Sequence, residues 1–248
     1  MTIDVSATPL DLPHVAWADS LDGLAAIRDS GTTMAIHPRV PDAAIAAFVN
    51  HRAVTDFCCL RCEVRNVGAE IQIEHELDQA GLPASFGRWA FGADIARLVT
   101  AFSRLSGAST VRLRLDRITD DACRLFHPDN VPVRLVCTYR GPATQWLPED
   151  ICDRAGIGSG DNDRICRDWP RVQSLRPYWV GVMKGERWPV PRAAACCTAR
   201  PPWPPATGAC SWRSTQWSDG RERPRAEIVR IVQRQAFSCS RAPLHPLW

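Results

Sequence analysis

The sequence predicts an α+β fold, in which N-terminal helices pack on a small antiparallel double-stranded β-helix of the cupin or jelly-roll type, incomplete at the C-terminus. Two patterns support this prediction. Residues 86–106 place six large apolar side chains at helical spacing, and Gly107 is suited to end the helix. Residues 111–118 then alternate apolar and charged side chains, which is typical of a half-exposed strand, and more apolar strands follow at 131–139 and 179–183.

Shorter elements surround these segments. A helical pattern begins after Ser20 and ends at Gly31, and a second helix is expected from Asp42 to Val54, directly after Pro41. The rest of the region is expected to form a turn at 140–142, a short extended piece at 145–147 and a loop with some helix at 148–160.

The chain changes character near residue 190. Residues 1–189 carry 21 basic and 24 acidic side chains, whereas residues 190–248 carry 9 and 3. Four prolines within residues 201–205 exclude regular structure there. We therefore expect a single α+β domain over 1–189 and a poorly ordered tail over 190–248. The tail is rich in Trp, Cys and Pro rather than lysine, so a nucleic-acid partner is not expected.

Composition also limits the expected cellular compartment of the protein. No run of 18 apolar residues occurs, which argues against a membrane partner, and no secretory signal is recognised at the N-terminus. The 11 cysteines are an odd number without a disulfide spacing, which favours reduced thiols and a cytoplasmic protein. The sequence identifies no particular small-molecule substrate.

Two local motifs have ordinary interpretations. Residues 58–62 contain Cys59 and Cys62 in a Cys-x-x-Cys pattern, but no second pair stands at zinc-finger distance, so buried strand cysteines are expected. The glycine-rich segment 156–162 lacks the Lys-Ser/Thr of a phosphate loop and is expected to be a surface turn.

The segment that starts at Phe126 carries the main functional signal. His127 and Asp129 stand two residues apart directly before an apolar strand, so both side chains point to the same side of an extended segment. One imidazole and one carboxylate are two thirds of the 2-His-1-carboxylate set that binds iron in non-haem oxygenases. The simpler interpretation is a turn at the strand entry, in which Asp129 caps local amides and His127 lies on the surface.

Several motifs resemble one bacterial family, the domain of unknown function 1826. They are Cys123-Arg-Leu-Phe-His-Pro-Asp129, Arg134-Leu-Val-Cys-Thr-Tyr-Arg-Gly-Pro142, Gln145-Trp-Leu147, Gly160-Asp-Asn162 and Lys184-Gly-Glu-Arg-Trp-Pro189. The resemblance runs through about residues 15–189. The family's expected ending, Gly-Arg-Gly-Leu-Leu-His-Arg-Ser-Pro followed by an Arg-Arg-Leu strand, is missing.

A shift of reading frame accounts for that loss. One permitted set of codons for residues 192–219, read one frame over, spells G-R-G-L-L-H-R-S-P-A-V-A-A-S-D-R-R-L-F-L-A-I-D-A-V-E and then a stop. We therefore expect the residues after about 189 to be out of frame. In the chain as it stands, Thr198 falls near the place of the missing histidine.

The recovered histidine and an arginine ten residues after it give a ligand spacing that resembles the iron- and 2-oxoglutarate-dependent oxygenases. This resemblance implies that His127 and Asp129 bind Fe(II), and that an arginine pairs with the distal carboxylate of 2-oxoglutarate. Arg134, Thr138 and Tyr139 are placed where strand residues could reach the cosubstrate, with Tyr139 on the opposite face from the other two. The activity is expected to be impaired in this chain. The alternative is a non-catalytic metal-binding or accessory protein linked to zinc homeostasis.

Overall fold

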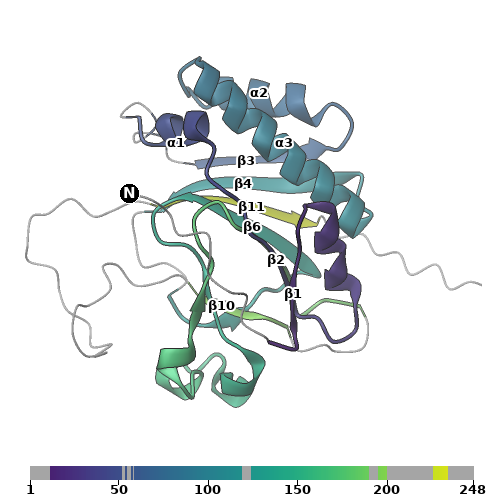
Figure 1. Cartoon of the computed structure of the whole chain (residues 1–248), viewed down its shortest axis with the longest axis vertical. Helices are drawn as coiled ribbons and strands as arrows, with labels where there is room; N and C mark the ends of the chain where they lie inside the picture. The colour runs from purple at the N-terminus through teal and green to yellow at the C-terminus, as the bar shows by residue number, and fades with distance from the viewer. Residues whose placement is uncertain are drawn as a thin grey trace, which may run out of the picture.

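The computed structural model describes residues 12–51, 54, 57, 59–118, 124–189, 195–199 and 226–233. Within them, two sheets and a layer of helices are stacked (Figure 1). The helices are α1 (Ala43–Val49), α2 (Ala69–Gln79) and α3 (Phe86–Ser106), preceded by the short 3-10 helix η1 (Asp22–Arg28). They cover one side of the larger sheet, and the smaller sheet lies on its other side.

The larger sheet has the strand order β1-β2-β9-β6-β11-β4-β3 and is antiparallel except for the pair β1–β2. Its strands are β1 (Val15–Trp17), β2 (Met34–His37), β9 (Val180–Lys184), β6 (Val133–Arg140), β11 (Ala226–Gln233), β4 (Thr110–Ile118) and β3 (Cys59–Arg65). The smaller, antiparallel sheet has the order β5-β10-β7-β8, with β5 (His127–Pro128), β10 (Cys197–Ala199), β7 (Gln145–Trp146) and β8 (Gln173–Ser174).

Strands β4 to β11 are connected as a jelly roll. Four of them follow one another as β4-β11-β6-β9 in the larger sheet, and the other four make up the smaller sheet. Apart from the step from β7 to β8, each strand of this series is followed in the chain by a strand of the other sheet. Two four-stranded sheets wound together in this way enclose one interior. The predicted α+β fold with a double-stranded β-helix is confirmed.

Two apolar clusters separate the layers. The larger cluster fills the space between the helices and the sheet, and it includes Phe91, Ile95, Leu135 and Val180. The second lies between the two sheets and includes Val136, Trp146, Leu175 and Met183. Consecutive residues of β6 therefore enter different clusters, because side chains alternate across a strand.

The long helix α3 has the bounds that the sequence predicts. The Ser85 side chain accepts a hydrogen bond from the Arg88 amide at its start, and Gly107 ends it with φ +71°. The helix expected from residue 42 is shorter, since α1 ends at Val49. No helix in the part of the chain that the structure describes is long and apolar enough to cross a membrane.

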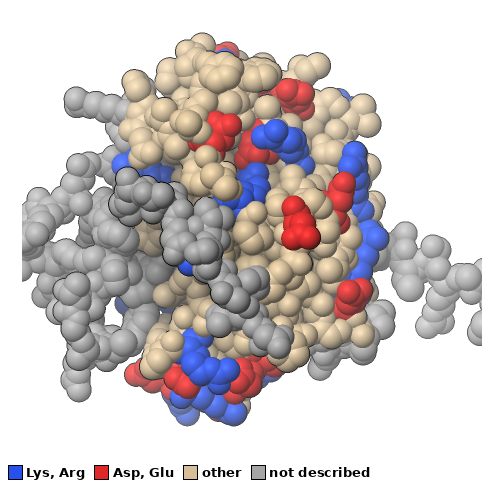
Figure 2. Space-filling model, viewed as in Figure 1, with Lys and Arg blue, Asp and Glu red and all other residues tan. Residues whose placement is uncertain are grey.

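Four short 3-10 helices form the excursion between β7 and β8. They are η3 (Glu149–Ile151), η4 (Arg154–Gly156), η5 (Asn162–Arg164) and η6 (Trp169–Arg171). Acidic and basic side chains gather together at this end of the molecule (Figure 2). The helical content expected over residues 148–160 is thus present as 3-10 turns.

Two strands come from the segment expected to be a poorly ordered tail. β10 lies inside the smaller sheet, between β5 and β7, and β11 lies inside the larger sheet, between β6 and β4. These are the closing positions of the jelly roll, which we expected to be unfilled. The rest of the tail, residues 190–194, 200–225 and 234–248, lies outside the described residues.

Candidate metal centre

His127 faces the interior of the jelly roll. It is the first residue of β5 and lies directly opposite Thr198 of β10. Thr198 in turn lies opposite Trp146, whose side chain packs between the sheets with Val136. Residues directly opposite each other on neighbouring strands point to the same face of the sheet. His127 and Thr198 therefore both face the larger sheet, and Asp129 follows on the same side.

The two predicted ligands converge. His127 Nε2 lies 3.9 Å from Asp129 Oδ1; the imidazole is partly exposed, whereas the carboxylate is buried. His127 Nδ1 lies 2.7 Å from the carbonyl oxygen of Leu125. Because a carbonyl oxygen can only accept, Nδ1 is the donor in this contact, and in the neutral ring the lone pair is then on Nε2. An imidazole that binds a metal through Nε2 needs this tautomer, commonly oriented by a backbone carbonyl.

Arg134 forms an ion pair with Asp129 beside His127. It comes from β6, and its Nη1 atom lies 2.6 Å from Asp129 Oδ1, the same oxygen that faces His127. The side chains of Arg134 and Asp129 are only 20% and 6% exposed, so this ion pair lies largely out of water. The sequence predicts Arg134 near a cosubstrate, and the structure brings it beside the candidate metal ligands.

The other two residues predicted to reach a cosubstrate, Thr138 and Tyr139, lie on opposite faces of β6. Thr138 is buried on the same face of β6 as Arg134. Tyr139 points to the opposite face, where its ring packs on Phe91 of α3 and its hydroxyl donates to Asp94 Oδ2 at 2.5 Å. Tyr139 therefore supports the packing of helix on sheet and lies on the wrong side of β6 to reach a ligand beside His127.

Within the described residues, no third side chain of a metal-binding type stands beside His127 and Asp129. The residue directly opposite His127 is Thr198, and its neutral hydroxyl is not among the usual ligands of a 2-His-1-carboxylate centre. Among the residues that the structure describes, no group of three or more His, Cys, Asp or Glu side chains is arranged to hold a metal ion. The donor set fits two positions of an iron site and does not fit the third.

Comparison with known proteins decides the family. The sequence profile described as "Protein of unknown function (DUF1826)" matches residues 18–210, which is most of the chain. The chain belongs to this family. Its match extends past residue 189, where the recognisable motifs end, and includes β10.

Solved structures resemble this chain only at low sequence identity. A dioxygenase for auxin oxidation from Arabidopsis thaliana, in complex with 2-oxoglutarate, is 7% identical, covers 90% of this chain and 92% of its own, and has a TM-score of 0.46. A prolyl-4-hydroxylase from Pseudomonas putida is 11% identical, covers 88% and 100%, and has a TM-score of 0.42. No curated protein matches. The fold assignment therefore rests on the strand order described above.

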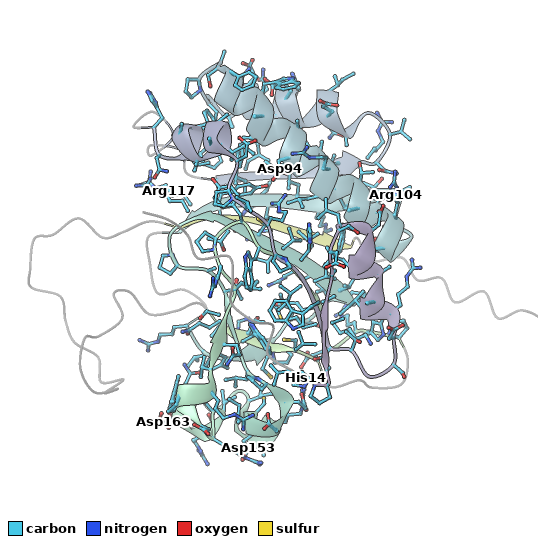
Figure 3. The ribbon with its side chains drawn as sticks, viewed as in Figure 1. His14, Asp94, Arg104, Arg117, Asp153 and Asp163 are labelled. Carbon is cyan, nitrogen blue, oxygen red and sulfur yellow. The ribbon has the colours of Figure 1, made fainter. Side chains whose placement is uncertain are left out.

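One family motif, Gly160-Asp-Asn162, holds the segment that leads into His127. Asn162 is buried; its Oδ1 accepts from the Phe126 amide at 2.8 Å, and its Nδ2 donates to the Arg124 carbonyl at 2.9 Å. Figure 3 places Asp163, the next residue, at the end of the molecule formed by the 3-10 helices. We expected only a surface turn here, and the contact could not be read from the sequence because 36 residues separate Asn162 from Phe126.

A second motif, Lys184-Gly-Glu-Arg-Trp-Pro189, holds the segment that leaves Asp129. The Gly185 amide donates to the backbone carbonyl oxygen of Pro132, and the Glu186 amide donates to the backbone carbonyl oxygen of Asp129, each at 2.9 Å. A Cβ atom at residue 185 would lie 2.0 Å from the Val131 carbonyl oxygen, so only glycine fits this approach. The His127–Asp129 segment is thus fixed on both sides by residues far away in the chain.

The Cys-x-x-Cys pair lies away from this site, on the edge strand β3. Cys59 is exposed and Cys62 is half-buried, so the expectation of two buried cysteines is wrong for Cys59, while Cys58 lies outside the described residues. Burial raises the pKa of the Cys62 thiol to about 12. A thiol that stays protonated is a poor metal ligand.

Proposed function

We propose that members of this family bind Fe(II) inside the jelly roll and use 2-oxoglutarate and dioxygen to oxidise a small-molecule substrate. The supporting observation is the convergence of His127 Nε2 and Asp129 Oδ1 at 3.9 Å, with the His127 tautomer held by a backbone carbonyl. Iron, when bound with its cosubstrate, supplies the activation of dioxygen.

The residues of this chain have distinct parts in the proposal. His127 presents a neutral nitrogen and Asp129 presents a carboxylate. Arg134 and Thr138 lie on the facing strand β6, on the side that looks toward the smaller sheet, and Arg134 has the charge and planar geometry that suit a cosubstrate carboxylate. Among the described residues, these two ligands lack a third and do not by themselves complete an iron site.

We propose further that activity in this chain is impaired by the loss of the distal histidine. In the shifted reading, the histidine codon overlaps that of Thr198, and residue 198 lies directly opposite His127. A ligand at this position would face the same interior as the other two. Resequencing the DNA around codon 189 tests the frame: a sequence that supports the present frame, without an overlapping reading of that kind, would contradict it.

The substitution Thr198→His tests the metal site directly. We expect the full-length variant to bind Co²⁺, a spectroscopic substitute for Fe(II), at least about ten-fold more tightly than the unmodified chain, because it supplies a third ligand. Gln145→His is the matched control: Gln145 follows the alternation to the opposite face from Trp146, so its histidine is directed away from His127.

Oxygen consumption distinguishes an oxygenase from a non-catalytic metal-binding protein. Iron-loaded Thr198→His should consume oxygen only with 2-oxoglutarate, and His127→Ala should abolish this. Tight zinc binding without turnover would favour the non-catalytic metal-binding role. A folded Thr198→His variant that binds no metal better than the Gln145→His control would refute the metal site itself.

A further inference from the structure

The inner face of the larger sheet, which looks toward the smaller sheet, has two chemically different halves. The apolar cluster between the sheets takes its larger-sheet residues from β1, β2, β6 and β9, and no described residue of β3 or β4 belongs to it. On β4, Leu113 and Leu115 pack toward the helices. Because side chains alternate along a strand, Arg112, Arg114 and Asp116 face the inner side. The half of the inner face formed by β3 and β4 is therefore charged.

Two arginines stand directly opposite each other on this charged half. Arg61 of β3 pairs with Arg114 of β4. Two residues further along β3, Glu63 pairs with Arg112 on the same face. The Cβ atoms of directly opposite residues are only about 5 Å apart, and like charges in that position destabilise a sheet. We call Arg61, Arg112 and Arg114 the arginine cluster; their side chains are 62%, 59% and 38% exposed, so a dissolved anion can reach them.

The neighbouring acidic side chains hold the arginine cluster only loosely. Asp116 lies between Arg61 and Arg114, 4.0 Å from a guanidinium nitrogen of each. Arg112 Nε lies 3.6 Å from the Glu63 carboxylate. All three distances are longer than a hydrogen bond. Within the described residues, the buried Nε atom of Arg114 has no hydrogen-bond partner, which is costly, so the cluster has donors available for an anion from solution.

The arginine cluster lies on the same sheet face as Arg134 of the candidate metal centre. Arg112 on β4 and Arg134 on β6 are both paired with Val232 of β11, so they stand at the same level two strands apart (Figure 1). At the usual spacing between strands, their Cα atoms are about 10 Å apart. A small molecule of about that length can therefore span from the arginine cluster to Arg134.

We infer that the arginine cluster binds the phosphate group of a phosphorylated small molecule. A phosphate monoester at pH 7 carries nearly two negative charges and three strong acceptor oxygens. Guanidinium groups bind phosphate with paired hydrogen bonds, and two opposite arginines present two such groups. The dianion offsets the repulsion between Arg61 and Arg114 more fully than a singly charged carboxylate does. That this molecule is the substrate of the oxidation rests on the proposed function; the binding of phosphate does not.

Calorimetry on the full chain tests the site, with phenyl phosphate as the probe, in a chelator and at pH 8. Benzoate is the matched ligand, because it keeps the ring and replaces the phosphate with a carboxylate. We expect phenyl phosphate to bind at least about ten-fold more tightly than benzoate, and Arg61→Gln or Arg114→Gln to weaken its binding at least about ten-fold. Arg104→Gln is the control variant, since Arg104 is about as exposed as Arg61 but pairs with Asp22, and it should leave the affinity unchanged.

The stability of the ligand-free protein separates a binding role from a structural one. Arg61→Gln removes one of two like charges, so its Tm should be unchanged or higher while the affinity for phenyl phosphate falls. A lower Tm with unchanged affinity would make Arg61 a structural residue and overturn the inference. The affinity of the unmodified chain should also decrease as the pH is lowered through about 6, where the phosphate loses its second charge.

The remaining outcomes decide between this site and the metal centre. Equal affinity for phenyl phosphate and benzoate, or an equal loss of affinity in Arg104→Gln and Arg61→Gln, would overturn the inference whatever the metal experiments give. If phenyl phosphate binds as expected and Thr198→His binds no Co²⁺, the phosphate site stands and the proposed function fails. If Arg114→Gln does not fold, Arg61→Gln decides the question alone, because its side chain is exposed on an edge strand.

Discussion

Asp94 of α3 offers the sharpest test of how the helical layer is attached to the jelly roll. The carboxylate lies beneath the helix (Figure 3), where Oδ1 accepts from Arg39 at 2.8 Å and from Arg97 at 3.0 Å, and Oδ2 accepts from Tyr139. Arg39 also donates to the Tyr178 carbonyl, so these contacts connect α3, β6 and the segment before β9. We predict that Asp94→Asn, which keeps the shape and removes the charge, severely destabilises the fold.

The expected size follows from burial. Asp94 is only 3% exposed, and without its charge the nearly buried guanidinium of Arg39 loses its counter-ion. Breaking one partner of such a pair costs about 3–5 kcal/mol of unfolding free energy. Asp22→Asn is the matched control, because its pair with Arg104 is exposed on both sides and should be worth less than about 1 kcal/mol.

Urea unfolding at pH 7 measures both variants. Burial by itself raises the pKa of Asp94, but Arg39 and the hydrogen bonds to the carboxylate outweigh it, so the pKa lies below its ordinary value of 3.8. The stabilisation is therefore fully present above that value and is lost as the pH falls through the lower folded pKa. The difference between the unmodified protein and Asp94→Asn should be constant from about pH 5 to 8 and shrink below about pH 4. A loss at pH 7 no larger than that of Asp22→Asn would refute the reasoning.

Three further predictions concern the surroundings of the candidate site. Gly185→Ala should lower the unfolding free energy by about 1–3 kcal/mol in urea unfolding, because the added methyl meets the Val131 carbonyl; an unchanged midpoint would contradict this. Asn162→Ala should lower the unfolding free energy by about 1–3 kcal/mol in the same measurement, since it leaves two backbone groups ahead of β5 unpaired. In a Thr198→His background, loss of Co²⁺ binding would show that β5, which carries His127, has been displaced. Hydrogen peroxide should join the thiols of Cys152 and Cys197, whose sulfur atoms lie 3.2 Å apart, into a disulfide with release of water, seen by mass spectrometry as the loss of two hydrogens; peptide maps that show both thiols free after oxidation would exclude it.

Elements with strong local signals could be predicted from the sequence. Helix α3 has its expected bounds because Ser85, Gly107 and an apolar stripe all act within the helix itself. Strands β4, β6 and β9 lie within two residues of their expected positions for the same reason. Short elements without such signals were missed: α2 follows Gly68 and buries only a narrow stripe that ends at Leu77, while β1 and β2 are defined by pairing with each other and with β9.

The candidate site also has some features set by local sequence and others set by tertiary contacts. The sequence by itself determined that His127 and Asp129 point to one side and that Arg134 and Tyr139 point to opposite sides of one strand, because alternation is a local property of an extended chain. Only the tertiary structure decided which face of β6 looks inward, that Arg134 reaches Asp129, and that Thr198 stands opposite His127. Those facts depend on which distant strands pair and in what register, and the pairing is set by packing of the whole jelly roll rather than by any local pattern.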